Sequence, residues 1–385
     1  MAQHSKKSAS AAHRWIHCPG SIRLSEKCPA PEGSDYAKEG TFAHAVAELK
    51  LRIARDQIVG ADELKQLTKD ELWTGEMDEA TNFYRDMVIE HLNAGGAGAE
   101  LLIEQRVDYS QWVDGGFGTS DAVIISDGLI EIVDLKYGQG IRVDATDNEQ
   151  MRLYALGAFE IFDGIYDFSR ISMTIVQPRF NHISTEELSV EELLKWGDEV
   201  ARPAAQLADK DDAPIVAGDW CRWCPAKAIC RARAEKNLEL ARYDFADPDL
   251  LTEDEIAEIM RRGDELTKWA ADVQEHALKQ AIAGTQYDGF KLVEGRSNRK
   301  YSDELKVAEK LTEAGYKEAV IYERKLLGLT AMEKLVGKKK LTELLKDLII
   351  KPAGKPTLVP NTDPREPINS AASAAADFSE KEESN

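Results

Sequence analysis

The chain has 385 residues, of which 43% are hydrophobic and 31% are charged, and its formal net charge is −20 at pH 7. This length exceeds a typical single core, so we expect a main domain followed by a smaller C-terminal module. No apolar run is long enough to cross a bilayer, which argues against a membrane protein. The N-terminus is polar and basic and lacks a signal peptide, so we expect a cytoplasmic protein in a reducing compartment.

The acidic balance is unusual for a protein that binds nucleic acid, because phosphate contacts require Lys and Arg. The charges are, however, unevenly distributed. Residues 286–360 hold 16 Lys and Arg against 11 Asp and Glu, and the first 30 residues are also basic. An acidic body with basic margins could confine DNA to one groove, and it fits a merely soluble protein equally well.

Helical patterns dominate the first hundred residues. The segment Gly40–Glu48 predicts a helix that places His44 and Glu48, four residues apart, on one face. Residues 61–94 predict a second helical segment with an apolar stripe. A Gly-rich break then leads into a predicted strand over Glu100–Val107.

A β-hairpin is predicted over residues 118–137. Two apolar, β-rich runs are joined by Asp127-Gly128, a pair typical of a two-residue type I′ turn. In the register that this turn favours, Ser126 pairs with Leu129.

This register brings charged residues together. Asp121 lies directly opposite Asp134, with Cβ atoms about 5 Å apart, and the period of two returns Lys136 to the same face. A solvated strand surface is the ordinary explanation of such residues, but the apolar strands favour a sheet buried on both sides, where charges need partners. Two close carboxylates repel each other unless a cation lies between them, and Mg²⁺ suits such a pair. Glu131 has the opposite parity and is left out of this site.

The next helix and strand complete a sheet. Gln150 and Tyr154 share one helical face, where an amide and a phenol can hold a phosphate or orient a water, although an ordinary amphipathic helix explains them almost as well. A strand is predicted at Ile171–Gln177, and residues 186–209 are predicted to be helical. The pattern favours an α/β fold with a mixed sheet of about four strands flanked by helices.

The five cysteines are Cys18, Cys28, Cys221, Cys224 and Cys230. The last three form a Cys-x2-Cys-x5-Cys pattern, and clustered cysteines in a reducing compartment indicate metal ligands rather than disulfides. Three thiolates need a fourth, for which Cys18 is the best candidate and Cys28 the alternative. Four thiolates also form a closed zinc site, so zinc stays an alternative.

The C-terminal third is predicted to be mainly helical. A capping box at Thr252–Glu255 opens a helix that reaches Ala283. Beyond it, helices are predicted around Asp303–Ala314 and Ala331–Leu348, after a short β-like piece at residues 289–295. The basic residues of this region are candidates for DNA contact or plain surface: Arg296, Arg299, Lys300 and Lys338 to Lys340.

Several of these motifs carry a resemblance. Gly118-Thr119-Ser120-Asp121, followed by Ile132–Gly138, resembles the core of PD-(D/E)XK nucleases in their RecB-type exonuclease branch. Gly40–Glu48 resembles the first helix of that family, whose His binds metal, and Gln150–Tyr154 resembles its Gln-x-x-x-Tyr helix. The cysteine layout, with the segment Ser8–Pro19, resembles the AddB-type and CRISPR-adaptation exonucleases that carry an iron-sulfur cluster.

The resemblance implies a restriction-endonuclease-like core and a deoxyribonuclease activity that depends on Mg²⁺ or Mn²⁺. The enzyme would be an exonuclease that acts in phage DNA replication or recombination. Its expected partners are DNA ends or single-stranded DNA and other phage proteins. In this interpretation the cation ligands are Asp121, Asp134, His44 and the carbonyl of Leu135, with Lys136 orienting or deprotonating water and Glu48, Gln150 and Tyr154 supporting the site. The ligands of a [4Fe-4S] cluster are Cys18, Cys221, Cys224 and Cys230.

The corresponding domain organisation is a nuclease domain over residues 1–235, a connecting helix over 236–285, a C-terminal module over 286–352 and a disordered tail over 353–385. A catalytically silent DNA-binding subunit of a recombination complex is the alternative function, although such proteins usually lose the lysine or an aspartate. The whole chain also resembles an uncharacterised family that is common in phages and prophages and is known by a domain of unknown function.

Overall fold

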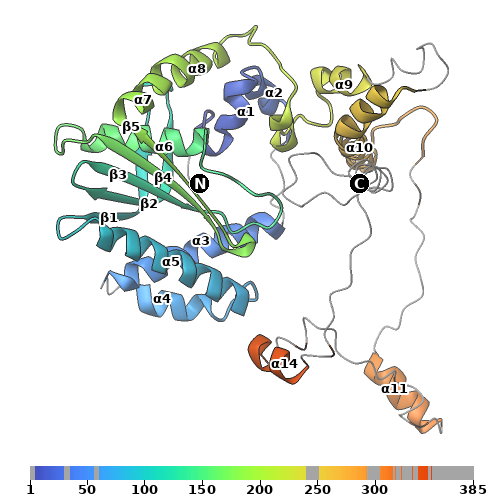
Figure 1. The fold of residues 1–385 in the computed structure, drawn as a ribbon. Helices are drawn as coiled ribbons and strands as arrows, with labels where there is room; N and C mark the ends of the chain where they lie inside the picture. Colours follow the sequence, from blue (N-terminus) through green and yellow to red (C-terminus); the bar gives the residue numbers. More distant parts are fainter. Residues whose placement is uncertain are drawn as a thin grey trace, which may run out of the picture. The chain divides into compact units, whose positions relative to one another are not determined.

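The computed structural model describes residues 5–29, 35–55, 60–239, 251–291, 304–314 and 337–345, together with a few single positions (Figure 1). The chain divides into two compact units, Met1–Gly284 and Thr285–Asn385. No helix in these described ranges is long and apolar enough to cross a membrane.

Short and long helices precede the sheet. They are η1 (Ala9–Ala11), α1 (Ala12–His17), α2 (Ser21–Glu26), α3 (Asp35–Ala54), α4 (Gly60–Leu67) and α5 (Gly75–Ala94). The helical segment predicted at residues 61–94 is therefore two helices. The second begins where the Thr74 side chain accepts a hydrogen bond from the Met77 N–H at 3.1 Å, which caps α5.

The centre of the first unit is one five-stranded mixed sheet. Its strands are β1 (Glu100–Asp108), β2 (Phe117–Ser126), β3 (Leu129–Leu135), β4 (Arg170–Gln177) and β5 (His182–Ser189), in the order β1-β2-β3-β4-β5. Only β3 and β4 pair in parallel, and α6 (Glu149–Phe162) forms the crossover between them. The Asn148 side chain caps α6 by accepting a hydrogen bond from the Met151 N–H at 3.2 Å.

The hairpin register agrees with the prediction. Pairing runs from Ser126 opposite Leu129 to Ala122 opposite Val133. The predicted turn type is wrong, however, because a type I′ turn needs positive φ at both central residues. Gly128 has a φ of 72°, whereas Asp127 does not have a positive φ. The two-residue loop length, rather than the turn type, has set the register.

Helices cover both faces of the sheet (Figure 1). Alternate strand residues, such as Val123 and Ile132, pack in one core with α6. The residues between them, such as Ile124 and Val133, pack in a second core with α3 and α5. The strands are thus buried on both sides, as their apolar sequences predict.

β5 was not among the predicted strands, and the helix predicted at residues 186–209 begins only at Val190. The residues of β5 alternate between half-buried and exposed, as expected for an edge strand, and β5 pairs with β4 alone. Ser189 then forms a capping box with Glu192. The helical stretch that follows has three parts: α7 (Val190–Trp196), the π-helical turn η3 (Gly197–Ala201) and α8 (Arg202–Ala208).

The cysteine-rich segment leads into two packed helices. It contains η4 (Asp219–Trp223) and continues into α9 (Arg231–Leu238), while α10 (Glu253–Ile282) has the predicted capping box and length. The buried Arg233 joins α9 to α10 through ion pairs with Glu265 at 2.6 Å and Asp272 at 2.7 Å. Because the buried Arg233 charge needs partners, these ion pairs hold α10 against α9 within the first unit.

The second unit contains α11 (Glu304–Glu313) and α14 (Lys338–Leu344). The first agrees with the helix predicted at residues 303–314, and the second lies within the helix predicted at residues 331–348. The β-like piece at residues 289–295 is not a strand where it is described, at Gly289–Lys291 and Val293. The basic residues at 296–300 and the tail at 353–385 lie outside the described residues.

Candidate active site

The first group of candidate residues lies where the hairpin pairing of β2 and β3 ends. One oxygen of Asp121, Oδ2, accepts a hydrogen bond from the Leu135 N–H at 2.7 Å. The other oxygen, Oδ1, lies 3.1 Å from Nδ1 of His44 on α3. Burial lowers the pKa of His44, but the Asp121 carboxylate outweighs this effect and raises that pKa to about 9. The backbone donor therefore fixes the aspartate, which in turn orients the imidazole.

Glu104 of β1 completes this group, and the sequence prediction missed it. Potential ligand atoms of His44, Glu104 and Asp121 all lie within 4.8 Å of one another. Burial and the charges of Asp121 and Glu48 raise the pKa of Glu104 to about 7. Carboxylates held this close, with a shared imidazole, are the surroundings in which a divalent cation relieves repulsion.

The backbone of Glu104 is strained. Its φ is 49°, in the left-handed region, although Ile103 pairs with Ala122 and Gln105 pairs with Ser120 in an unbroken register on either side. Such a conformation costs a non-glycine residue about 1 to 3 kcal/mol and persists only where surrounding structure enforces it. The strain directs attention to Glu104 as a functional position. Its signal in the sequence was weak, because Glu104 is one of several charged residues in the strand ELLIEQRVD.

The second group joins β3 to α6. The Lys136 Nζ lies 2.9 Å from Asp134 Oδ2 and donates a hydrogen bond to Gln150 Oε1 at 3.0 Å. The Gln150 side chain donates in turn to Asp134 Oδ1 and to the Tyr154 hydroxyl, each at 3.3 Å. Four predicted residues, Asp134, Lys136, Gln150 and Tyr154, therefore form one network.

Asp134 is the most buried acid of the site, with 2% of its surface exposed. Its ion pair with Lys136 falls outside hydrogen-bond geometry, and among the described residues Oδ2 of Asp134 has no hydrogen-bond partner. Burial raises the pKa of Asp134, the charge of Lys136 opposes this, and the charge of Asp121 adds to it, leaving the pKa raised. A buried carboxylate oxygen without a hydrogen bond is a position where a cation can bind without displacing a protein donor.

The two groups meet at Leu135, but they do not share all their contacts. Asp134 and Lys136 both contact Gln150 of α6, in agreement with the predicted common face. Asp121 was predicted opposite Asp134 on that same face. The pairing of β2 with β3 ends at Ala122 and Val133, however, and the Asp121 carboxylate contacts His44 of α3, which packs on the other face of the sheet. Leu135, whose carbonyl was the further predicted ligand, lines the same pocket as His44 and Asp121.

Glu48 and Glu131 occupy supporting positions. Glu48 lines the pocket of His44 and forms an ion pair with Arg52 at 2.7 Å, one turn further along α3. Glu131 is buried and lies 2.5 Å from His91 of α5, away from the network of Lys136. Leaving Glu131 out of the predicted site agrees with this placement.

Gly118 brings β2 close to α6. A Cβ atom on Gly118 would lie 2.8 Å from Cε1 of Tyr154, which is closer than carbon atoms approach in proteins. The glycine of the Gly-x-x-Asp motif is therefore needed to let the Tyr154 ring pack beside the strand that carries Asp121.

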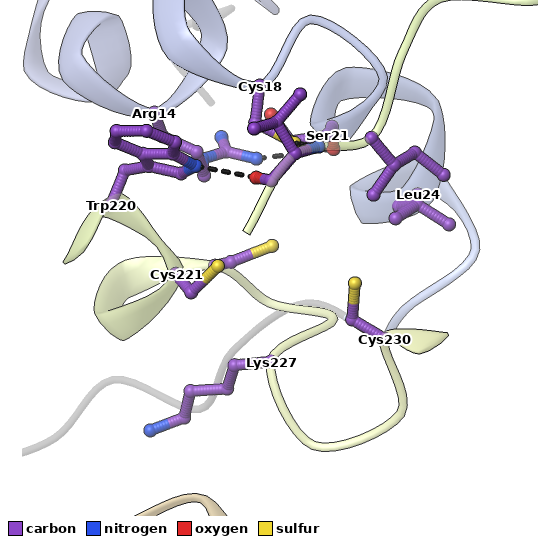
Figure 2. A pocket seen from close by; sticks show the side chains of 11 residues that line it. Arg14, Cys18, Ser21, Leu24, Trp220, Cys221, Lys227 and Cys230 are labelled. Carbon is purple, nitrogen blue, oxygen red and sulfur yellow. Dashed lines mark hydrogen bonds between the residues drawn. The ribbon is translucent and has the colours of Figure 1, made fainter. Parts of the chain in front are cut away.

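Four cysteines line one pocket (Figure 2). They are Cys18, which follows α1, Cys221 of η4, Cys224, and Cys230 at the start of α9, and all four are buried free thiols. Cys28 does not line this pocket, and its thiol instead donates to the Leu24 carbonyl at 3.5 Å. The structure thus brings Cys18, and not Cys28, together with the Cys-x2-Cys-x5-Cys segment.

The surroundings of the four sulfurs suit bound thiolates. The Val216 N–H donates to Cys18 Sγ at 3.3 Å, and the Gly218 N–H donates to Cys221 Sγ at 3.4 Å. Burial raises the pKa of the Cys18 and Cys221 thiols, and the neighbouring cysteines add to this. Because metal coordination is what keeps buried thiols deprotonated together, this donor set fits a metal or a cluster.

Fold and site together define a mixed α/β protein that has a His, Glu and Asp group beside an Asp and Lys network, and a four-cysteine pocket. The chain belongs to the family described as "Protein of unknown function (DUF2800)", whose family model matches residues 4–366. Among solved structures, the chain titled "Crystal structure of SSO0001" is similar over 57% of this chain and 96% of that chain, with 14% identity and a TM-score of 0.23.

Proposed function

We propose that the protein is a Mg²⁺- or Mn²⁺-dependent deoxyribonuclease of the PD-(D/E)XK type. The observation that carries the proposal is the position of Lys136, held between Asp134 and Gln150 beside the His44, Glu104 and Asp121 group. A lysine next to paired acids is suited to phosphodiester hydrolysis, whereas a structural surface would leave these charges in solvent.

The residues present fit a hard divalent cation. Asp121 and Glu104 offer carboxylate oxygens, Asp134 offers an oxygen without a hydrogen bond, and His44 offers an imidazole nitrogen. The predicted set of His44, Asp121, Asp134 and Leu135 therefore gains Glu104 as a further candidate. When bound, the cation supplies Lewis-acid stabilisation of charge on the phosphate and favours deprotonation of water.

The protein side chains do the positioning. Gln150 accepts a hydrogen bond from Lys136 and donates to Asp134, so the Nζ of Lys136 is held in one place. From this position Lys136 can orient the attacking water and donate to a phosphate oxygen as negative charge develops. Tyr154, which accepts from Gln150, holds the amide in the orientation that this network requires.

The cysteine pocket suits a structural [4Fe-4S] cluster. Cys18 precedes the catalytic elements and the other three cysteines follow them, so a cluster would join the segments on either side of those elements. Closing a loop of this length constrains the unfolded chain, and loss of the cluster should therefore unfold the unit rather than merely slow catalysis. The resemblance of the motifs extends the proposal to DNA ends and to phage replication or recombination in the host cytoplasm.

The activity is tested on protein purified without oxygen. End-labelled linear DNA and closed circular DNA are each incubated with Mg²⁺ or Mn²⁺. Three proteins are compared: wild type, Lys136→Ala and the control Lys195→Ala, which replaces an exposed lysine of α7. We expect Lys136→Ala to lose about a hundredfold or more of the activity and Lys195→Ala to retain it. Equal activity in wild type and Lys136→Ala, or no activity in either, would refute the proposed nuclease activity. DNA binding without hydrolysis would instead favour the alternative function, a catalytically silent DNA-binding subunit.

The cluster is tested on the same preparation by iron, sulfide and zinc analysis and by visible absorption. We expect about four irons and four sulfides per chain and a brown protein. A colourless protein with one zinc per chain would replace the cluster by a closed zinc site.

A further inference from the structure

A second cluster of metal-binding side chains lies outside both sites, at the junction of α1, α6 and η4. His13 and His17 are four residues apart on α1, so both project from one helical face. Glu149, the first residue of α6, places Oε1 at 3.1 Å from His13 Nδ1 and 2.8 Å from His17 Nε2. Asp219 of η4 lies 3.4 Å from the other ring nitrogen of His13, Nε2.

A neutral His13 ring cannot satisfy its contacts with hydrogen bonds alone. Both ring nitrogens of His13 face carboxylates, but a neutral imidazole carries only one N–H, so the ring must be doubly protonated to donate to Glu149 and Asp219 together. A metal ion bound to Nδ1 removes the need for the second proton. Nε2 then keeps its proton and donates to Asp219, which is the carboxylate–histidine–metal arrangement that orients metal-binding histidines in proteins.

We propose that His13, His17 and Glu149 bind one divalent transition-metal ion, of which Zn²⁺ is the best match. Potential ligand atoms of the three residues all lie within 4.8 Å of one another. Tetrahedral zinc with bonds near 2.0 Å needs ligand atoms about 3.3 Å apart, close to the separations present here. Two imidazoles and one carboxylate favour zinc over Mg²⁺, which prefers oxygen ligands and retained water.

The site is accessible from solvent. The side chains of His13, His17 and Glu149 are 50%, 40% and 14% exposed, so an ion can reach them without any rearrangement of the core. Three protein ligands leave a fourth position open to water, in contrast to the closed set of four cysteines.

An ion bound at this cluster would connect elements that belong to the cysteine pocket and to the candidate active site. α1 ends at His17, immediately before Cys18, and the His17 ring stacks on Trp220, with ring centroids 4.8 Å apart. Trp220 lines the cysteine pocket. On the other side, Glu149 precedes Gln150, which contacts Lys136. Zinc bound here would fasten α1, which leads into Cys18, to α6, which carries Gln150.

The test is zinc binding, which does not depend on nuclease activity. Protein that retains its cysteine-bound metal is titrated with Zn²⁺ by calorimetry in an Asp121→Asn background, which weakens the other candidate cation site. We expect one equivalent of Zn²⁺ to bind, and Glu149→Gln or His17→Ala to weaken this binding at least tenfold. His276→Ala, on α10, is the matched control and should leave it unchanged.

Glu149→Gln keeps the side-chain volume and one hydrogen-bond acceptor, so we expect this variant to fold. It therefore tests the site even if His17→Ala fails to fold. A second readout is Co²⁺ absorption, which should show visible ligand-field bands without a sulfur charge-transfer band, and these bands should be lost in Glu149→Gln. Unchanged Zn²⁺ binding in both variants would overturn the proposal and reduce the cluster to a hydrogen-bonded junction. No zinc binding in the Asp121→Asn background would overturn it as well.

Discussion

Replacement of Glu104 by glutamine gives the sharpest test of the cation site, because its effect on stability should reverse when the cation is added. Glutamine has nearly the same volume and removes only the charge. Without a divalent cation, the charged Glu104 is disfavoured by burial and by the Asp121 and Glu48 carboxylates. With the cation, the same charge becomes a ligand.

The sign and size follow from the pKa of Glu104, which rises from 4.5 to about 7 on folding. A carboxyl with a raised pKa favours the folded state fully below pH 4.5, and this contribution is lost as the pH rises through about 7. The full shift corresponds to roughly 3 kcal/mol, and screening of this partly exposed side chain reduces it to about 1 to 2 kcal/mol. In chelator at pH 8, Glu104→Gln should therefore be more stable than wild type by that amount, with a smaller difference at pH 5.

The assay is thermal unfolding of the anaerobically purified protein at pH 5 and pH 8, with EDTA or with Mn²⁺. In EDTA at pH 8, we expect the variant to melt about 2 to 6 °C above wild type. Saturating Mn²⁺ should stabilise wild type by about 2.7 kcal/mol at a hundred times the dissociation constant, and should stabilise the variant much less.

Glu48→Gln is the matched control for this experiment. Glu48 lines the same pocket but forms an ion pair with Arg52, so its replacement should give no reversal between EDTA and Mn²⁺. A Glu104→Gln protein that is less stable than wild type in EDTA at pH 8, or whose stability difference is the same at pH 5 and pH 8, would refute the reasoning.

Two further substitutions test packing and the cysteine pocket. Gly118→Ala forces the new Cβ against the Tyr154 ring, so we expect urea unfolding to show a loss of about 1 to 3 kcal/mol in stability, together with lower nuclease activity. Gly75→Ala is the control and should change neither property, because its Cβ meets nothing within 4 Å. Cys18→Ser should lose the bound metal or cluster in elemental analysis and Cys28→Ser should retain it, because Cys18 lines the pocket and Cys28 does not; equal metal content in the two variants would contradict this assignment.

Local patterns in the sequence were sufficient for the hairpin. Its register follows from the number of residues between two apolar strands, and the observed pairing of Ser126 with Leu129 agrees. The turn type could not be obtained in the same way, since Asp127 tolerates either sign of φ and the flanking strands decide between them. The helix that carries Gln150 and Tyr154 was also predicted, from the spacing of these two residues and the motif they resemble, and it is present as α6.

Strand β5 shows where local patterns failed. The segment His182–Ser189 has only two large apolar residues, Ile183 and Leu188, among polar ones. Its pattern therefore does not distinguish the strand period of two residues from the helix period of about 3.6 residues. It is a strand because β4 offers it a free edge, along which Thr174 and Thr185 also hydrogen-bond at 2.9 Å. An edge of that kind exists only once the rest of the sheet has formed.

The sequence by itself determined the register of the hairpin and the spacing of three cysteines, because the period of a strand and the reach of a short loop are local properties. Only the tertiary structure decided that Cys18 completes the pocket, that Glu104 joins His44 and Asp121, and that Glu149 meets His13 and His17. These partners lie on elements far apart in the chain. The packing of helices on both faces of one sheet brings them together, and no spacing rule in the sequence encodes that packing.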